Sequence, residues 1–167
     1  RFFENKEFYL ESREMNHGIP SLAYSFVIKD KLRLDKKKIR KLDLPNSHLI
    51  VDLQKGKDVS FDGKKIKVKD VTYLEKGRKV SFIFDTLMND SAVKLVKDSD
   101  LLICESSFSK EDKKLAKEHL HLTTEDAATI AKKAKVKKLI LTHISQRYEN
   151  DPSSLLKAAK KIFKNTE

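Results

Sequence analysis

The sequence predicts a layered α/β domain that is interrupted by a basic insertion. After residue 79, short apolar runs alternate with helical patterns, which is typical of buried strands with helices packed on their sheet. The chain has 167 residues and 39% of them are hydrophobic, enough for a folded core. Of its 36 Lys and Arg, 16 lie between Lys31 and Lys79, against seven Asp and Glu. We therefore expect residues 1–30 and 77–167 to form the α/β body and residues 31–76 to form an insertion, here called the basic arm.

The first half of the chain carries separate signals for the body and for the arm. Aromatic and β-branched residues predict strands at 7–11 and 24–29. In the arm, residues 35–42 read as a short helix that stops before the turn residues 45–47, Pro-Asn-Ser. Asp-Gly between two strand-like runs predicts a hairpin over 59–64.

The second half alternates strands and helices. Continuous apolar runs predict three buried strands, at 80–84, 100–104 and 138–142. Helical patterns occupy the connections, at 91–97, 110–119, 124–135 and 153–164. The helix at 124–135 has an alanine-rich apolar side and Thr123 or Thr124 as its N-cap.

Composition excludes several classes of protein. The single Cys104 rules out a scaffold of internal disulfides, and no apolar run approaches the ~18 residues of a membrane span. We therefore expect a protein of a reducing compartment, the cytoplasm, with no membrane partner. The net charge is +11, and the stretch from Lys31 to Lys79 holds +9 of it. Such a block binds nucleic-acid phosphates or simply forms a solvated surface, and charge alone leaves both interpretations open.

Polar residues follow the three apolar strands where each strand ends. Asp85, Glu105 and His143 stand at these ends, His17 precedes a Gly turn, and His121 lies between two predicted helices. Since ligands of open α/β sheets bind beyond the carboxyl ends of the strands, the three strand-end residues are expected to converge on one cleft. His and Asp are the ligand types that zinc and manganese take. Any one of these residues alone would more often be structural.

Four segments together resemble the second half of the ribonuclease Z family, the endonucleases of the metallo-β-lactamase fold that process tRNA 3′ ends. The segments are Met15–Gly18, Ile83–Thr86, Glu105–Phe108 continuing to His121–Thr124, and Leu141–Tyr148. The resemblance implies the C-terminal half of an αββα sandwich with an inserted basic α+β arm. It also implies a zinc-dependent endoribonuclease that removes the 3′ trailer of precursor tRNA after the discriminator nucleotide, and that works as a homodimer.

The resemblance assigns roles residue by residue. His17 would bind one of two zinc ions, Asp85 would bridge both and His143 would bind the other, with Mn²⁺ as an alternative metal. His121, supported by Glu105, would protonate the leaving 3′ oxygen. The substrate would be held by residues beside the scissile phosphate and by arm residues on the tRNA body: Arg147, Thr123 and Thr124, and Lys36, Lys37, Lys38 and Arg40.

The chain also departs from the family pattern. The His-x-His-x-Asp-His run that supplies most metal ligands does not occur, and Phe84 stands where the family has Gly. Because the sequence starts at Arg1 without a Met, we expect it to be the C-terminal part of a longer protein, inactive by itself. The alternatives are a non-catalytic RNA-binding subunit, a split relative of the same fold, and a related hydrolase of small phosphodiesters, against which the long basic arm argues.

Overall fold

The structure is a computed structural model that describes residues 1–45 and 47–167. Asn46, the middle residue of the predicted 45–47 turn, lies outside the described residues. The chain forms two compact units: residues 1–28 with 78–167, and residues 29–77. Each unit has its own hydrophobic core and is described by itself.

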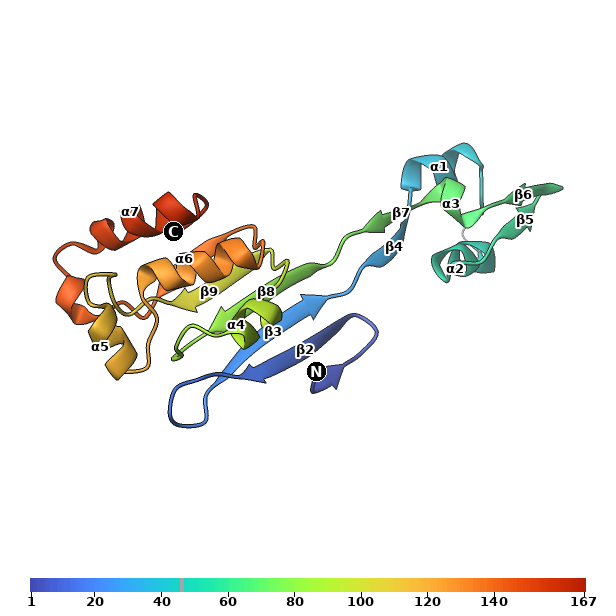
Figure 1. Cartoon of the computed structure of the whole chain (residues 1–167). Coiled ribbons are helices and arrows are strands. Elements are labelled where there is room, and N and C mark those ends of the chain that lie inside the picture. Colours follow the sequence, from blue (N-terminus) through green and yellow to red (C-terminus); the bar gives the residue numbers. More distant parts are fainter. Residues whose placement is uncertain (46) are drawn as a thin grey trace. The chain divides into compact units, whose positions relative to one another are not determined.

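The first unit is built on a six-stranded sheet with the strand order β1-β2-β3-β8-β9-β10 (Figure 1). Its strands are β1 (Phe3–Glu4), β2 (Phe8–Glu14), β3 (Leu22–Ile28), β8 (Arg78–Ile83), β9 (Leu101–Glu105) and β10 (Leu139–Thr142). Pairing is antiparallel from β1 to β8 and parallel from β8 to β10. The strands expected at 80–84, 100–104 and 138–142 are confirmed as β8, β9 and β10.

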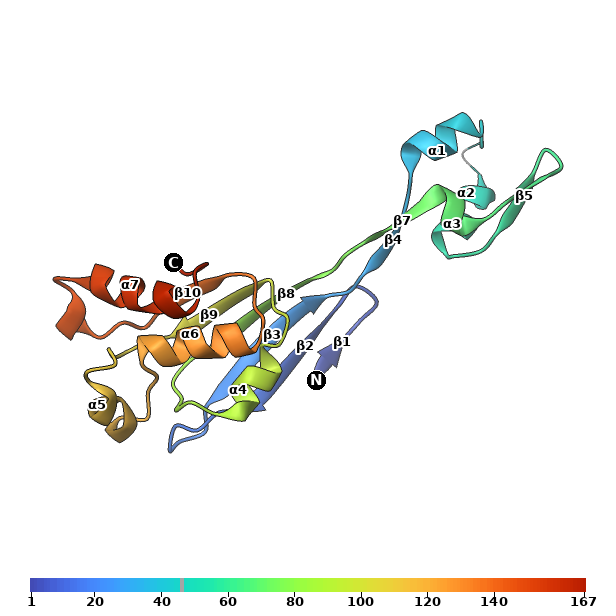
Figure 2. The same cartoon turned by 45° about the horizontal axis from the view of Figure 1, so that its top comes forward.

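Helices cover one face of this sheet (Figure 2). The helices of this unit are α4 (Asp90–Leu95), α5 (Lys113–Glu118), α6 (Thr124–Lys133), the 3₁₀ turn η1 (Gln146–Tyr148) and α7 (Pro152–Ile162), and of these α4 and α6 pack directly on the strands. The core lies between α4, α6 and the sheet, where Ile83, Leu102 and Leu139 meet Ile130. Cys104 lies in the same layer, and burial raises the pKa of its thiol well above the usual value. No helix in the described part of the chain is long and apolar enough to cross a membrane.

The opposite face of the sheet is also apolar, yet no described element of the first unit covers it. The strand register places one row of side chains on this face: Leu22, Tyr24 and Phe26 of β3, Phe82 of β8 and Phe84 after it. Tyr24 and Phe84 are each 42% exposed, and Phe82 stacks on Phe84. Apolar strands were expected to be covered by helices, but the helices shield one side of the sheet only. Exposed apolar patches of this kind mark interaction surfaces.

The second unit is small and mixes helices with two-stranded ribbons. Its elements are β4 (Lys31–Leu34), α1 (Lys36–Lys41), α2 (His48–Gln54), β5 (Val59–Phe61), β6 (Lys64–Ile66), α3 (Val68–Val71) and β7 (Thr72–Glu75). β4 pairs with β7, and β5 pairs with β6. Between β5 and β6, Asp62 and Gly63 have φ of 49° and 70°, as the two-residue hairpin turn requires. The predicted helix and hairpin are therefore confirmed, whereas α2 and the β4–β7 ribbon were not predicted.

Candidate metal-binding site

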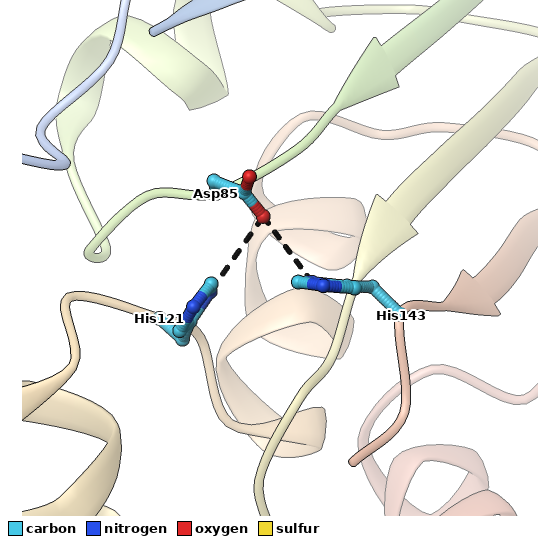
Figure 3. A group of neighbouring side chains, drawn as sticks. All are labelled: Asp85, His121 and His143. Atoms are coloured by element: carbon cyan, nitrogen blue, oxygen red, sulfur yellow. Dashed lines mark ion pairs between the residues drawn. The ribbon is translucent and has the colours of Figure 1, made fainter. Parts of the chain in front are cut away.

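The carboxyl ends of β8, β9 and β10 bring three predicted site residues to one edge of the sheet. Asp85 follows β8, Glu105 ends β9, and His143 follows β10. His121 reaches the same place from the loop between α5 and α6. Figure 3 shows both imidazoles turned toward the Asp85 carboxylate, whose Oδ1 lies 3.2 Å from His143 Nδ1 and 3.7 Å from His121 Nδ1. The expected convergence on one cleft therefore occurs.

Glu105 is the buried centre of the hydrogen-bond network. Its side chain is fully buried. Its Oε1 accepts from the Thr86 backbone N–H at 2.6 Å, and its Oε2 accepts from Ser107 Oγ at 2.9 Å. Both oxygens also lie 3.1–3.2 Å from His121 Nδ1. Since a carboxylate only accepts, His121 carries a proton on Nδ1 and keeps Nε2 for chemistry.

Ser107 links His143 to the same carboxylate. The single hydroxyl proton of Ser107 goes to Glu105, so its oxygen accepts the Nδ1–H of His143 at 3.1 Å. His143 therefore presents the lone pair of Nε2, the usual metal-binding form of a neutral imidazole. The sequence alone did not reveal a role for Ser107. This residue lies two positions after Glu105, in a segment that carries the family resemblance.

His17 lies beside this group but is held differently. Its Nδ1 donates to the Leu120 backbone carbonyl at 3.0 Å, which leaves Nε2 unprotonated in the neutral ring. Its ring centroid is 5.0 Å from that of His121. The following Gly18 has φ of 75°, a conformation that glycine adopts without a steric penalty, and so it allows the turn that carries His17.

Seven described non-glycine residues have a positive φ, and three of them lie at or beside this site. Asp85, Leu120 and His143 have φ of 39°, 59° and 55°, in the left-handed region that non-glycine residues rarely adopt. Each such residue costs of order 1–3 kcal/mol and persists where its surroundings hold it in place. Strained backbone at three positions around one cleft is typical of a functional site.

The donors at the site match the chemistry of a transition metal. Asp85, His121 and His143 each offer one ligand atom, and these atoms lie within 4.8 Å of one another. Nitrogen and oxygen donors of this kind suit zinc or manganese. Among the described residues this group contains His121, to which the family resemblance assigned acid catalysis, and not His17, to which the resemblance assigned metal binding. With three protein ligands, at least one coordination position stays open.

The other predicted contacts of the body border the site. Arg147, in η1, lies with its guanidinium 5.4 Å from the centre of the Phe108 ring. Phe108 in turn helps to line a hollow of about 280 Å³ that also touches His121 and His143. Thr123 caps α6 by accepting from the Asp126 N–H, and the Thr124 hydroxyl donates to the Phe108 carbonyl. Both threonines are buried, so the contacts that the structure gives them are internal.

The predicted tRNA contacts of the arm lie in the second unit. Lys36, Lys37, Lys38 and Arg40 occupy α1 and are exposed. Asp35 caps this helix by accepting from the Lys37 and Lys38 N–H groups. With Lys41, the structure therefore presents five exposed cationic side chains on one short, capped helix.

Comparison with known proteins identifies a matching family and several similar relatives. A model of the β-lactamase superfamily domain matches residues 54–144, more than half of the chain. Ribonuclease Z of Listeria monocytogenes serotype 4a is 40% identical over 169 residues, and that of Prochlorococcus marinus subsp. pastoris is 42% identical over 171 residues. These alignments cover 99% and 98% of this chain and 55% of each relative. The chain thus spans about half the length of the curated relatives it matches.

Solved structures resemble the chain as well. The short form of human tRNase Z aligns with a TM-score of 0.54 at 28% identity, over 87% of this chain and 39% of that one. YhfI, a metallo-β-lactamase fold protein from Bacillus subtilis, aligns with a TM-score of 0.61 at 19% identity, over 98% of this chain and 47% of that one. At 19% identity, the similarity to YhfI shows a shared fold and nothing more. Taken with the family match and the predicted fold class, these findings establish that the chain belongs to the β-lactamase superfamily.

Proposed function

We propose that the complete protein is a metal-dependent endoribonuclease that removes the 3′ trailer of precursor tRNA by hydrolysis after the discriminator nucleotide. One observation carries this proposal: the fully buried Glu105 carboxylate holds His121 by Nδ1 beside the carboxylate of Asp85. The similarity to proteins named ribonuclease Z, at 36–42% identity over most of the chain, supports the choice of substrate.

Different residues of this chain would carry out different parts of the proposed reaction. Glu105 fixes the tautomer and orientation of His121, and a proton on the Nε2 of His121 would go to the leaving 3′ oxygen. Arg147, whose guanidinium lies 5.4 Å from the centre of the Phe108 ring, would hold the scissile phosphate. Asp85 and His143, with His17 beside them, would hold zinc, which when bound supplies Lewis-acid polarisation of the phosphate.

The remaining assignments rest on the family resemblance. We propose two zinc ions per complete site, precursor tRNA as the macromolecular partner, a homodimer as the working form, and the cytoplasm as the compartment. The basic arm would hold the tRNA body by its phosphates and shape, since double-helical RNA offers little sequence information to side chains.

If the basic arm binds tRNA, removing the arm should weaken tRNA binding without changing the hydrolysis of a small phosphodiester. Leu34 pairs with Thr72 across the β4–β7 ribbon, so an Asn-Gly turn replacing residues 35–71 would close the ribbon. In the complete protein this change should weaken binding of precursor tRNA by at least about tenfold and flatten its salt dependence, because phosphate contacts are lost. Hydrolysis of bis(p-nitrophenyl) phosphate should be unchanged.

The control for this prediction compares two double variants that each remove two positive charges, one in the first unit and one in the basic arm. Lys132→Gln with Lys133→Gln, on α6 of the first unit, should leave tRNA binding nearly intact, whereas Lys36→Gln with Lys37→Gln should weaken it. Filter binding over a salt series measures both pairs. Equal loss of tRNA binding and of small-molecule hydrolysis in the turn variant would show that the arm is part of the catalytic body.

We also propose that the open aromatic face of the six-stranded sheet packs against the rest of the complete protein. The relatives are almost twice as long as this chain, and a sheet that is apolar on both faces needs a cover on both. Tyr24→Lys should reduce dye binding and self-association of the 167-residue chain alone. In the complete protein the same change should lower the free energy of unfolding by roughly 2 kcal/mol or more, because it buries a charge.

A matched control for this prediction lies in the other unit. Leu74 is 51% exposed, so Leu74→Lys adds the same charge at an apolar position outside the aromatic face. It should change neither the dye binding of the chain nor the unfolding midpoint of the complete protein. Destabilisation of the complete protein by Leu74→Lys but not by Tyr24→Lys would contradict the packing proposal.

A further inference from the structure

The second unit contains a hollow of about 800 Å³, and apart from Lys36 and Arg40 its lining residues have no part in the function proposed above. Its floor is apolar and is formed by Leu34, Ile39, Leu44 and Ile50. Leu34, Ile39 and Leu44 pack against the core of the unit from the other side, so the floor is held in place. The volume falls within the ~300–1,000 Å³ of typical small-ligand pockets.

One wall of the hollow comes from the β4–β7 ribbon. Tyr73 lies on this wall and is 55% exposed, although a tyrosine ring is largely apolar. Arg33, its direct partner across the ribbon, also lines the hollow. The Arg33 Nε donates to Glu75 Oε2 at 2.7 Å, which fixes the guanidinium at the rim. The wall therefore presents an aromatic ring beside a planar, oriented cation.

The opposite rim adds positive charge and an amide. Lys36 and Arg40 line the hollow from α1, and Gln54 lines it from the end of α2. The lining thus contains three cationic side chains and one anionic side chain. An apolar floor, a ring for stacking and a cationic rim are the features with which proteins bind single nucleotides of RNA.

We propose that this hollow binds one unpaired nucleobase of an RNA ligand, stacked on Tyr73, with the flanking phosphates on Lys36 and Arg40. A paired base has both of its faces stacked within the helix, so only an unpaired or splayed base can enter a concave site. Gln54 supplies the amide donor and acceptor that read the edge of a base. The inference deepens the proposed function, on which it rests for the identity of the RNA.

The test compares three variants of the complete protein. Tyr73→Leu removes the aromatic ring, Tyr73→Phe keeps it, and Leu74→Ala truncates the neighbouring exposed residue, whose side chain points to the other face of β7 and does not line the hollow. The probes are a fluorescein-labelled single-stranded RNA 12-mer and a blunt RNA duplex of the same length. Fluorescence anisotropy gives the Kd of each. Precursor tRNA cleavage is measured separately.

Tyr73→Leu should weaken binding of the single strand by about tenfold, the loss expected for one stacked base, and leave the Kd of the duplex unchanged. Tyr73→Phe and Leu74→Ala should bind both RNAs like the parent protein. A 4-thiouridine in the single strand should cross-link to the hollow in the parent protein.

Two results would overturn the proposal: equal binding of the single strand by Tyr73→Leu and the parent, or an equal loss for strand and duplex. A parent protein that cleaves no precursor tRNA, but whose single-strand binding depends on the Tyr73 ring, would refute the proposed function and leave the nucleobase site standing.

Discussion

Replacing Asp85 by asparagine is expected to abolish cleavage of precursor tRNA and to lower the metal content of the complete protein. Asp85 supplies the only carboxylate of the three-residue group that can hold a metal. The amide keeps the size of the side chain and tolerates the left-handed backbone at φ of 39°, so the fold is retained. What is lost is the negative charge between His121 and His143. Elemental analysis for zinc and a single-turnover cleavage assay measure the two effects.

Asp98 provides the matched control. It has φ of 57°, follows α4 in the same unit, and lies outside the metal-binding group. Asp98→Asn should therefore leave metal content and cleavage at the level of the parent protein. If Asp85→Asn kept its full zinc content, Asp85 would not be a metal ligand, whatever happened to the cleavage rate.

Replacing His121 by alanine should slow cleavage of precursor tRNA by roughly 10²–10⁴-fold while the metal is retained, as for a lost general acid. The loss should depend on the leaving group. A 3′ oxygen of RNA needs a proton as it departs, whereas p-nitrophenolate leaves without one, so hydrolysis of bis(p-nitrophenyl) phosphate should suffer far less. Glu105→Gln should reproduce the defect in part, because the buried carboxylate no longer orients the imidazole.

The control for His121 is its neighbour His119. His119 stacks on Phe108 and lines the same hollow, but it does not belong to the group of possible metal ligands. His119→Ala should leave the difference between the two substrates unchanged. Loss of metal together with activity in His121→Ala would make His121 a ligand and refute its role as the acid. The structure makes this comparison informative because His121 lies within the ligand group.

The strands that position the site were predictable because their sequences are continuously apolar. Such runs are typical of strands with a buried face in a parallel sheet, and here β8 and β9 lie inside the six-stranded sheet while β10 lies at its end. The β4–β7 ribbon escaped prediction because Lys31–Leu34 and Thr72–Glu75 have only four residues each, too few for a periodic pattern to identify a strand. Helix α2 was missed because Ser47 was assigned to a turn, whereas its hydroxyl accepts from the Leu49 N–H and caps the helix.

The sheet itself shows what an apolar pattern cannot specify. Phe82 and Ile83 are both apolar, but Ile83 is buried under the helices and Phe82 faces the open side. The pattern predicted burial on both faces, and only the structure shows that the described helices cover one of them. What covers the other face is not encoded in these strands.

The site was predictable where a residue follows a strand. Asp85, Glu105 and His143 could be grouped because parallel strands end at one edge. Ser107 could not be found in this way, since its role depends on the direction of one hydroxyl proton between Glu105 and His143. The internal hydrogen bonds of Thr123 and Thr124 likewise depend on the exact entry of the chain into α6.

Mapping the cut in an end-labelled precursor tRNA, treated with the complete protein and zinc or manganese, tests the proposed function most directly. We expect a single cut immediately after the discriminator nucleotide, with a 3′ hydroxyl on the tRNA, and no cut when the metal is chelated. Tight binding of the precursor without cleavage, under metals that load the site fully, would contradict this expectation and leave an RNA-binding subunit as the better description.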